Sequence, residues 1–356
     1  MTTDSDAASA RSDRRKAIVQ MVVGLGLLLL LFGVILPSFI DYGLVFEAMR
    51  SLEAWQLLVL LALALIRLPI ESSLYTATIP GLGFADGLLS YLASNTVADL
   101  APPPADLAVR FGMYKSLGVS TEAAGVGIIA SGFFSIGARL VLPVIALVLV
   151  IATGPADEET WVLAAIGVSA LVGGVALVAL ILRSEKFTLR IGDRVGRVAN
   201  RIAARFGKQL DADNLGTKAS DFRIKILGVL RTRWPRATAA VIGSHIMGYT
   251  ILLASMRFIG ISNSQVDWID LLVAYAIVRL ITLIPITPGG IGVAAAGYIV
   301  VLGVGQDQGL ANLIGAASFL TRIFVWLVPL LIGIGPLLMW RKRMKRQDAT
   351  DQAPSA

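Results

Sequence analysis

The stretch Pro285-Ile286-Thr287-Pro288-Gly289-Gly290 interrupts an apolar region that runs from residue 268 to residue 305. Proline has no backbone N–H and disfavours helix at the residue before it, so this region predicts a helix, a break and a second helix. A similar interruption, Ala101-Pro102-Pro103-Pro104-Ala105-Asp106, lies in the middle of the region from 84 to 118. The sequence therefore predicts two broken, re-entrant-like helix pairs, and it leaves open whether their arms cross the membrane fully or turn back halfway.

The two broken regions are related by a fixed offset of 184 residues without a gap. The identical pairs at this offset are Asp86 and Asp270, Leu88 and Leu272, Tyr91 and Tyr275, Pro104 and Pro288, Val109 and Val293, and Tyr114 and Tyr298. Three predicted spans separate the two regions, and this odd number places the second copy in the membrane in the opposite direction to the first. An inverted repeat with discontinuous helices is typical of secondary transporters, whose binding site lies near the midplane.

The composition excludes a soluble globular protein. Of the 356 residues, 56% are hydrophobic and 15% are charged, and the mean hydropathy is +0.77, whereas soluble domains carry roughly 25% charged residues. There is no cysteine, and His245 is the single histidine. These counts exclude a disulfide framework, a cysteine nucleophile and the usual zinc sites, and we expect no cofactor.

Six segments are apolar over the roughly 20 residues that a helix needs to cross a bilayer. They are residues 18–36, 55–74, 123–151, 161–182, 237–258 and 312–339. The first follows Arg14, Arg15 and Lys16 and lacks a small-residue cleavage pattern, so we expect a retained span rather than a cleaved signal. The fold class is thus an all-α polytopic membrane protein with six transmembrane helices plus the two broken pairs.

The distribution of basic residues predicts the topology. Twenty-three of the 31 Lys and Arg residues lie before residue 17, between 183 and 236, or after 340. By the positive-inside rule we expect a multi-pass protein of the cell membrane with both termini in the cytoplasm. The expected parts are a disordered tail (1–16), a first membrane half (17–182), a basic cytoplasmic segment (183–236), a second membrane half (237–340) and a basic tail (341–356).

The run from Pro285 to Val293, followed by Thr321-Arg322 and Pro329, resembles the carboxy-terminal signature of the lysylphosphatidylglycerol synthase transmembrane-region family, also described as flippase-like. The run from Asn95 to Tyr114 is similar to that family's first broken pair. This resemblance implies a polytopic domain that moves an anionic phospholipid, a glycolipid or an isoprenoid-linked lipid between leaflets. Aminoacylating members carry a soluble transferase domain. The chain ends at a short basic tail, so we do not expect aminoacylation by this polypeptide itself.

Two other functions stay open from the sequence. One is a membrane-embedded transferase, or an accessory subunit in lipid modification, acting on a lipid carrier. The other is a secondary transporter of an ion or a small solute. The acidic residues are dispersed rather than clustered, which does not favour the general base or the metal site that a transferase would need.

Arginines within apolar sequence are the main candidate site residues, because each costs about 2.5 to 3.5 kcal/mol near the bilayer centre. They either contact an anionic ligand or pair with Asp99, Asp106 or the carbonyls of the broken helices. The candidate substrate-binding residues are Asn95, Asp106, Arg110, Arg139, Arg279, Pro288, Gly289, Gly290 and Arg322. Arg67 and Glu71, four residues apart, predict a local ion pair.

The alternatives at these positions are structural. Asp106 would cap its own helix, and Gly289 and Gly290 would form a tight packing turn. Within the basic segment, apolar residues recur every three or four positions over 187–206, and Arg residues recur at the same spacing on another face. This pattern predicts an amphipathic helix that lies on the inner leaflet and binds anionic lipid. A solvated linker is the alternative. We expect no nucleic-acid partner; a second copy or a lipid-modifying enzyme are further candidate partners.

Overall fold

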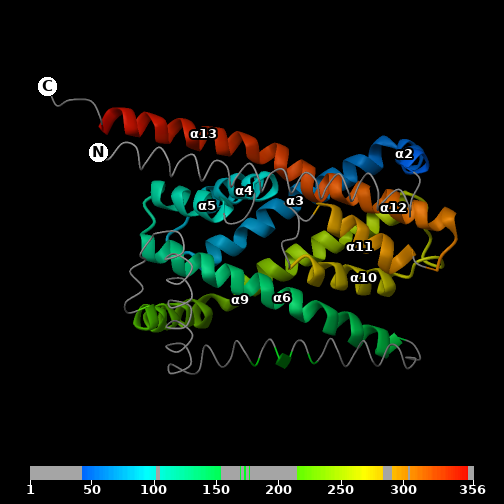
Figure 1. Cartoon of the computed structure of the whole chain (residues 1–356), viewed down its shortest axis with the longest axis horizontal. Coiled ribbons are helices and arrows are strands. Elements are labelled where there is room, and N and C mark those ends of the chain that lie inside the picture. The colour runs from blue at the N-terminus through cyan, green and yellow to red at the C-terminus, as the bar shows by residue number, and fades with distance from the viewer. Residues whose placement is uncertain are drawn as a thin grey trace, which may run out of the picture. The chain divides into compact units, whose positions relative to one another are not determined.

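The computed structural model describes residues 42–101, 105–153, 215–283, 291–303 and 305–351, together with four single positions between 169 and 176. Every regular element in these residues is helical (Figure 1). The elements are α2 (Tyr42–Arg50), α3 (Ala54–Thr78), α4 (Phe84–Leu100), α5 (Ala105–Ser116), α6 (Thr121–Thr153), α9 (Leu215–Phe258), α10 (Trp268–Ile281), α11 (Ile291–Gly303), α12 (Gln308–Arg322), the π-helix η4 (Ile323–Leu327) and α13 (Val328–Asp351).

Four helical stretches are long and apolar enough to cross a membrane: Ala54–Thr78, Thr121–Thr153, Ile224–Phe258 and Gln308–Met344. They contain four of the six predicted spans, and the chain is an all-α polytopic membrane protein. The predicted span at 18–36 lies outside the described residues, and so does most of the span at 161–182. The predicted amphipathic helix at 187–206 also lies outside them.

The order of long and short helices occurs twice. Long α3 is followed by the short arms α4 and α5 and by long α6; long α9 is followed by the short arms α10 and α11 and by the long helix formed by α12, η4 and α13. Contacts divide the described residues into two compact units. The first unit contains those of Met1–Ser73, Leu82–Val119 and Ile242–Ala356, and the second those of Leu74–Gly81 and Ser120–Val241.

In the first unit, α4 and α5 form an antiparallel hairpin. Ala93 and Val97 of α4 share one apolar cluster with Ala105, Val109 and Met113 of α5. At 17 and 12 residues, the arms are about 26 and 18 Å long, short of the roughly 30 Å of a bilayer core. The first broken region therefore folds back on itself, which the sequence left undecided.

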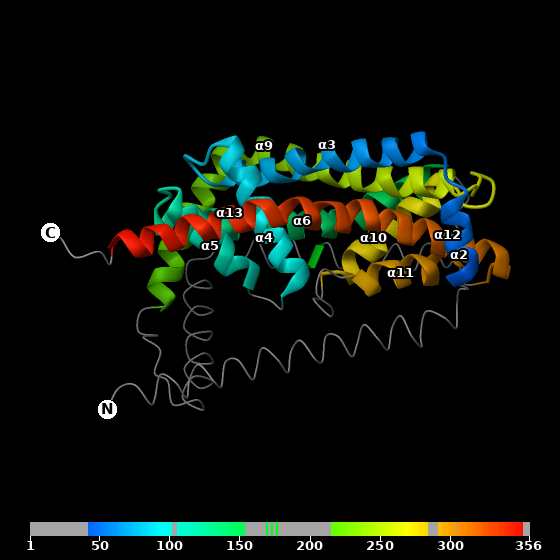
Figure 2. The ribbon, with the colours of Figure 1, turned by 90° about the horizontal axis from the view of Figure 1, so that it is seen from above.

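The α10/α11 hairpin repeats this arrangement. Its arms have 14 and 13 residues, pack against each other and run in opposite directions (Figures 1 and 2). Their approach is close, because a Cβ added at Gly297 would lie 2.8 Å from Val278 Cγ2. Both hairpins lie along the helix formed by α12, η4 and α13: α4 packs on α13, and α11 packs on α12. Gly333 allows the first of these contacts, since any Cβ there would collide with Leu92 and Thr96.

The π-helix η4 connects α12 to α13 and has a sequence cause. Pro329 has no N–H, so the carbonyl of Val325, four residues earlier, lacks its usual helical donor. The π-helix allows α12 to continue into α13 without a break in the chain of helical residues. Within it, the N–H of Val328 bonds to the carbonyl of Ile323, five residues earlier. The predicted span at 312–339 is thus one continuous helical stretch, but its backbone hydrogen bonds change from the α-helical to the π-helical pattern over Ile323–Leu327.

The second unit is built from α6 and the amino-terminal part of α9. Leu74 and Ala77 pack there against Ala237, Ala240 and Val241. Helix α9 begins at Leu215, 22 residues before the predicted span at 237. It contains Pro235, which removes one backbone hydrogen bond but does not end the helix. Lys225 of this extension pairs with Glu122 of α6.

Candidate functional site

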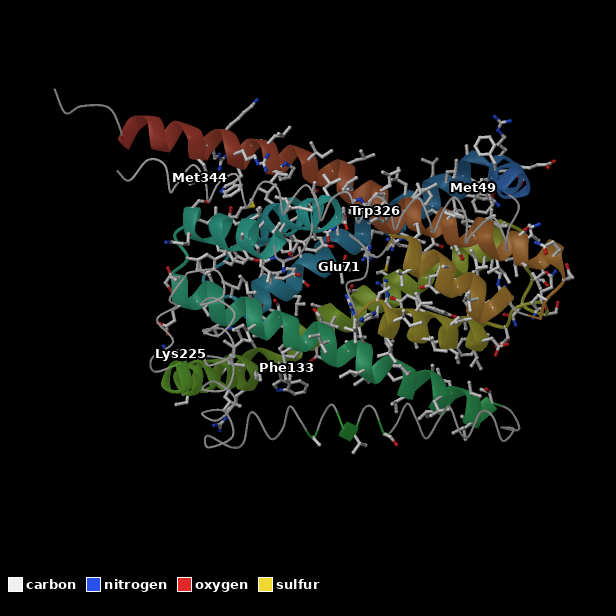
Figure 3. The ribbon with its side chains drawn as sticks, viewed as in Figure 1. Met49, Glu71, Phe133, Lys225, Trp326 and Met344 are labelled. Atoms are coloured by element: carbon white, nitrogen blue, oxygen red, sulfur yellow. The ribbon has the colours of Figure 1, made fainter. Side chains whose placement is uncertain are left out.

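Five charged side chains from four elements meet in the first unit. They are Arg67 and Glu71 of α3, Asp99 of α4, Arg279 of α10 and Arg322 of α12, and we call them the central cluster. Asp99 lies one residue before the end of α4, and Arg279 lies two residues before the end of α10. The two hairpins therefore direct the carboxyl ends of their first arms at the same group of charges. Figure 3 shows Glu71 there, together with Trp326 of η4.

Arg67 and Glu71 form the best-connected pair of the central cluster. Nη2 of Arg67 donates to Oε1 of Glu71 at 2.7 Å, and Nη1 donates to the carbonyl of Val325 at 3.1 Å. The hydroxyl of Tyr91 donates to Oε2 of Glu71 at 2.5 Å. Arg67 is 6% exposed and the side chain of Glu71 is 24% exposed, so the ion pair is largely buried. It links α3 to the α4/α5 hairpin and to η4.

Asp99 is buried and has fewer partners. Nδ2 of Asn95, one turn earlier on α4, donates to Oδ2 of Asp99 at 3.2 Å. Arg322 and Arg67 are the positive charges that act on the carboxylate, and Glu71 is the negative one. Trp326 also lies beside Asp99, but its indole N–H makes no hydrogen bond of good geometry in the described residues. A carboxylate with one amide donor relies on the neighbouring guanidinium groups for its charge balance.

Arg279 is surrounded by tyrosines. Its Cζ lies 4.9 Å from the ring centroid of Tyr275, and Tyr298 and Glu71 lie within its electrostatic range. Gly248 of α9 makes room for this group, because a Cβ there would lie 2.7 Å from the hydroxyl of Tyr275 and 3.1 Å from Nη2 of Arg279. The Tyr275 hydroxyl also lies 3.2 Å from Nδ1 of His245. Tyr91 and Tyr275, equivalent in the repeat, thus each contact the long helix that precedes their hairpin.

The central cluster has more positive than negative charge and unused donors. Three guanidinium groups face two carboxylates, which leaves one positive charge when both acids are ionised. Nε of Arg67 and Nε of Arg279 are buried and have no hydrogen-bond partner in the described residues. A buried unpaired donor costs about 1 to 3 kcal/mol. An anion with several oxygen atoms would satisfy both the charge and the donors.

The structure places the candidate residues in three groups. Arg279 and Arg322 lie in the central cluster, and Asn95 bonds to Asp99. Arg110 and Asp106 lie on α5; Nε of buried Arg110 donates to Oγ of Ser94 at 3.1 Å, and Asp106 is in the first turn. Arg139 lies on α6, in the second unit, and Pro288, Gly289 and Gly290 lie outside the described residues. Their roles stay predictions.

Several residues of the site were not among the candidates. The spacing of Arg67 and Glu71 predicts their pairing, but not their contacts with Tyr91 and Val325. Gly248 carries no signal in the sequence, because its neighbours Tyr275 and Arg279 come from another helix. For Val325 the signal is Pro329, four residues later. The described residues contain no group of three His, Cys, Asp or Glu residues that could hold a metal ion.

The comparisons with known proteins agree with this architecture. The model of the family described as lysylphosphatidylglycerol synthase TM region matches residues 18–333. Comparison with curated proteins and with solved structures found no match. The family match covers both hairpins and the whole central cluster, and it relates the chain to lipid modification or flippase function. The chain belongs to the lysylphosphatidylglycerol synthase transmembrane-region family.

Proposed function

We propose that the protein moves an anionic lipid between the leaflets of the membrane and binds the lipid phosphate at the central cluster. The observation that carries this proposal is the excess positive charge of the cluster together with the unpaired Nε donors of Arg67 and Arg279. Arginine binds phosphate oxygens through several N–H groups at once, and such charge-assisted bonds are strong where water is scarce. Phospholipids, glycolipid phosphates and isoprenoid-linked phosphates all supply this group.

The hairpins support the proposal. Helix α5 begins at Ala105, six residues after Asp99, so its amino end lies at the inner end of the α4/α5 hairpin. The N–H groups at a helix amino end attract anions. Short arms that fold back at membrane depth are tolerated where protein or a polar cavity covers them. A phosphate crossing the apolar region would meet groups that replace its water.

Transport in proteoliposomes tests this function. The purified protein is reconstituted, and the rate at which a fluorescent phosphatidylglycerol analogue changes leaflet is measured by dithionite quenching. We expect Arg279→Gln to slow the rate at least tenfold, because it removes one guanidinium from the phosphate site. Arg231→Gln, at an exposed position of α9, is the matched control and should keep the wild-type rate.

The outcomes separate the candidate functions. Unchanged flipping in Arg279→Gln, with the thermal stability of the wild type, would contradict the phosphate site. Flipping that is absent from the wild-type protein itself would contradict lipid translocation. In that case a covalently modified lipid product would favour the transferase, and solute uptake driven by an ion gradient without a lipid requirement would favour the solute transporter.

A further inference from the structure

A cavity lies where the start of α4 and the end of α5 meet α13, at the end of the hairpin opposite its break. Its volume is about 170 Å³, and its polar lining residues are Asp86, Ser90, Ser116, Trp340 and Arg343. Asp86 and Asp99 are 13 residues apart on α4, which is about 20 Å along a helix. This cavity is therefore separate from the central cluster.

The cavity contains one acid and one base that are not paired with each other. Asp86 and Arg343 both line it, and the ion pairs of the described residues do not include either. Ser90 also lines it; this side chain is fully buried, and its hydroxyl has no hydrogen-bond partner in the described residues. A ligand with a single charge would leave either Asp86 or Arg343 without a counter-charge. A ligand with both charges would satisfy both residues.

The walls of the cavity fit the edge of a membrane. Leu89, Met113, Leu117 and Met339 supply apolar surface. Trp340 is wedged against α5: its Nε1 donates to Oγ of Ser116 at 3.0 Å, and a Cβ at Gly112 would lie 3.2 Å from its ring. Tryptophan is enriched at the level of lipid headgroups. At about 30 Å³ for each water molecule, the volume equals about six waters, which suits a headgroup rather than a whole lipid.

We propose that this cavity binds the headgroup of a zwitterionic phospholipid. The phosphate bonds to Arg343, the ammonium group bonds to Asp86, and the hydroxyl of Ser90 supplies a further hydrogen bond. The start of the acyl chains lies against the apolar wall. This lipid is bound apart from the central cluster, so this proposal does not rest on the proposed function.

Native mass spectrometry of the purified full chain in detergent tests the site, with phosphatidylethanolamine as probe and phosphatidylglycerol as the lipid without an ammonium group. Asp86→Asn should weaken phosphatidylethanolamine binding about tenfold, the size expected for one charge-assisted bond, and should leave phosphatidylglycerol binding unchanged. Arg343→Gln should weaken the binding of both lipids. The matched controls are Asp270→Asn, at the equivalent position of the repeat, and Arg341→Gln, in the same basic run.

Ser90→Ala keeps the test independent of folding. Removing a buried hydroxyl that has no partner does not destabilise the fold, so this variant should melt like the wild type and bind phosphatidylethanolamine more weakly. Equal binding of phosphatidylethanolamine by wild type, Asp86→Asn and Arg343→Gln would overturn the proposal. Arg279→Gln should bind this lipid normally while transport is slow, so the two proposals fail separately.

Discussion

Nη1 of Arg67 donates to the carbonyl of Val325 at 3.1 Å, across 258 positions of sequence. Pro329 leaves this carbonyl without its usual helical donor, and η4 places it next to α3. The guanidinium therefore completes the backbone of one long helix while its Nη2 holds Glu71 on another. The Arg67 side chain thus bonds both to the π-helix and to Glu71 of the central cluster.

Arg67→Met should destabilise the protein strongly. It removes the donors to Oε1 of Glu71 and to the Val325 carbonyl, and it leaves the Glu71 carboxylate bonded to Tyr91 but without its paired positive charge. Breaking a buried ion pair from one side costs about 3 to 5 kcal/mol. The measurement is thermal unfolding in detergent. Arg67→Met/Glu71→Gln should recover part of the loss, because it removes the uncompensated charge. A single variant that melts like the wild type would show that the pair is not structural.

Gly248→Ala should slow lipid flipping several-fold. The new methyl group would lie 2.7 Å from the Tyr275 hydroxyl and would push it or Arg279 out of place. Gly228→Ala on the same helix is the control, since no atom lies within 4 Å of a Cβ there; it should keep the wild-type rate and gain up to about 1 kcal/mol in helix stability. Equal flipping rates in the two variants would contradict a role of Gly248 in positioning Tyr275 and Arg279.

Gly333→Ala should disturb the packing of the α4/α5 hairpin on α13. A Cβ at this position collides with the backbone of Leu92 and with Thr96, and overpacking typically costs about 1 to 3 kcal/mol. Gly335→Ala, two residues later, meets no atom within 4 Å and should be neutral or slightly stabilising. Differential scanning fluorimetry compares the two. The prediction is wrong if Gly335→Ala is the more harmful.

Asp267 should make the stability depend on acidity. Its Oδ1 accepts the backbone N–H of Ile269 at 2.8 Å as the amino-terminal cap of α10, and this bond lowers the pKa of the carboxyl. A lowered pKa stabilises the fold above the unfolded-state pKa, near 4, and the stabilisation is lost as the pH falls through the folded-state value.

The matched variant for this effect is Asp267→Asn. Asparagine caps a helix about as well as aspartate but does not titrate. Melting temperatures of the variant measured between pH 3 and pH 7 should therefore fall less at the acid end than those of the wild type. Parallel curves for the two proteins would contradict the assignment of this pH dependence to Asp267.

The sequence was informative where a single segment decides the structure. Apolar length identified the four spans that the structure describes, and Pro104 and Pro288 marked the regions where the arms break. Arg279 and Arg322 stood out because a charge in apolar sequence must face protein or a polar partner. These predictions need no knowledge of which helices are neighbours.

The rest depends on neighbours that sequence spacing does not show. A separation of four residues predicts the Arg67–Glu71 pair. The hydrogen bond from Tyr91 to Glu71 exists only because α4 lies beside α3, which the spacing does not show. Hydropathy does not report which backbone groups are hydrogen-bonded to each other. It therefore predicted an uninterrupted α-helix through Val325, where the structure has the π-helix η4. The early start of α9 was missed because apolar length alone set the predicted span at 237–258, whereas the helix continues through Pro235 into the basic sequence before it.

Solid-state NMR tests most directly whether a lipid phosphate occupies the central cluster. In proteoliposomes with phosphatidylglycerol, the dipolar coupling between the lipid ³¹P and ¹⁵N-labelled guanidinium groups reports their distance. We predict that Arg279→Gln/Arg322→Gln removes a component of short ¹⁵N–³¹P distance that the control Arg231→Gln/Arg341→Gln retains. The same short-distance component in wild type and in Arg279→Gln/Arg322→Gln would contradict phosphate binding at this site.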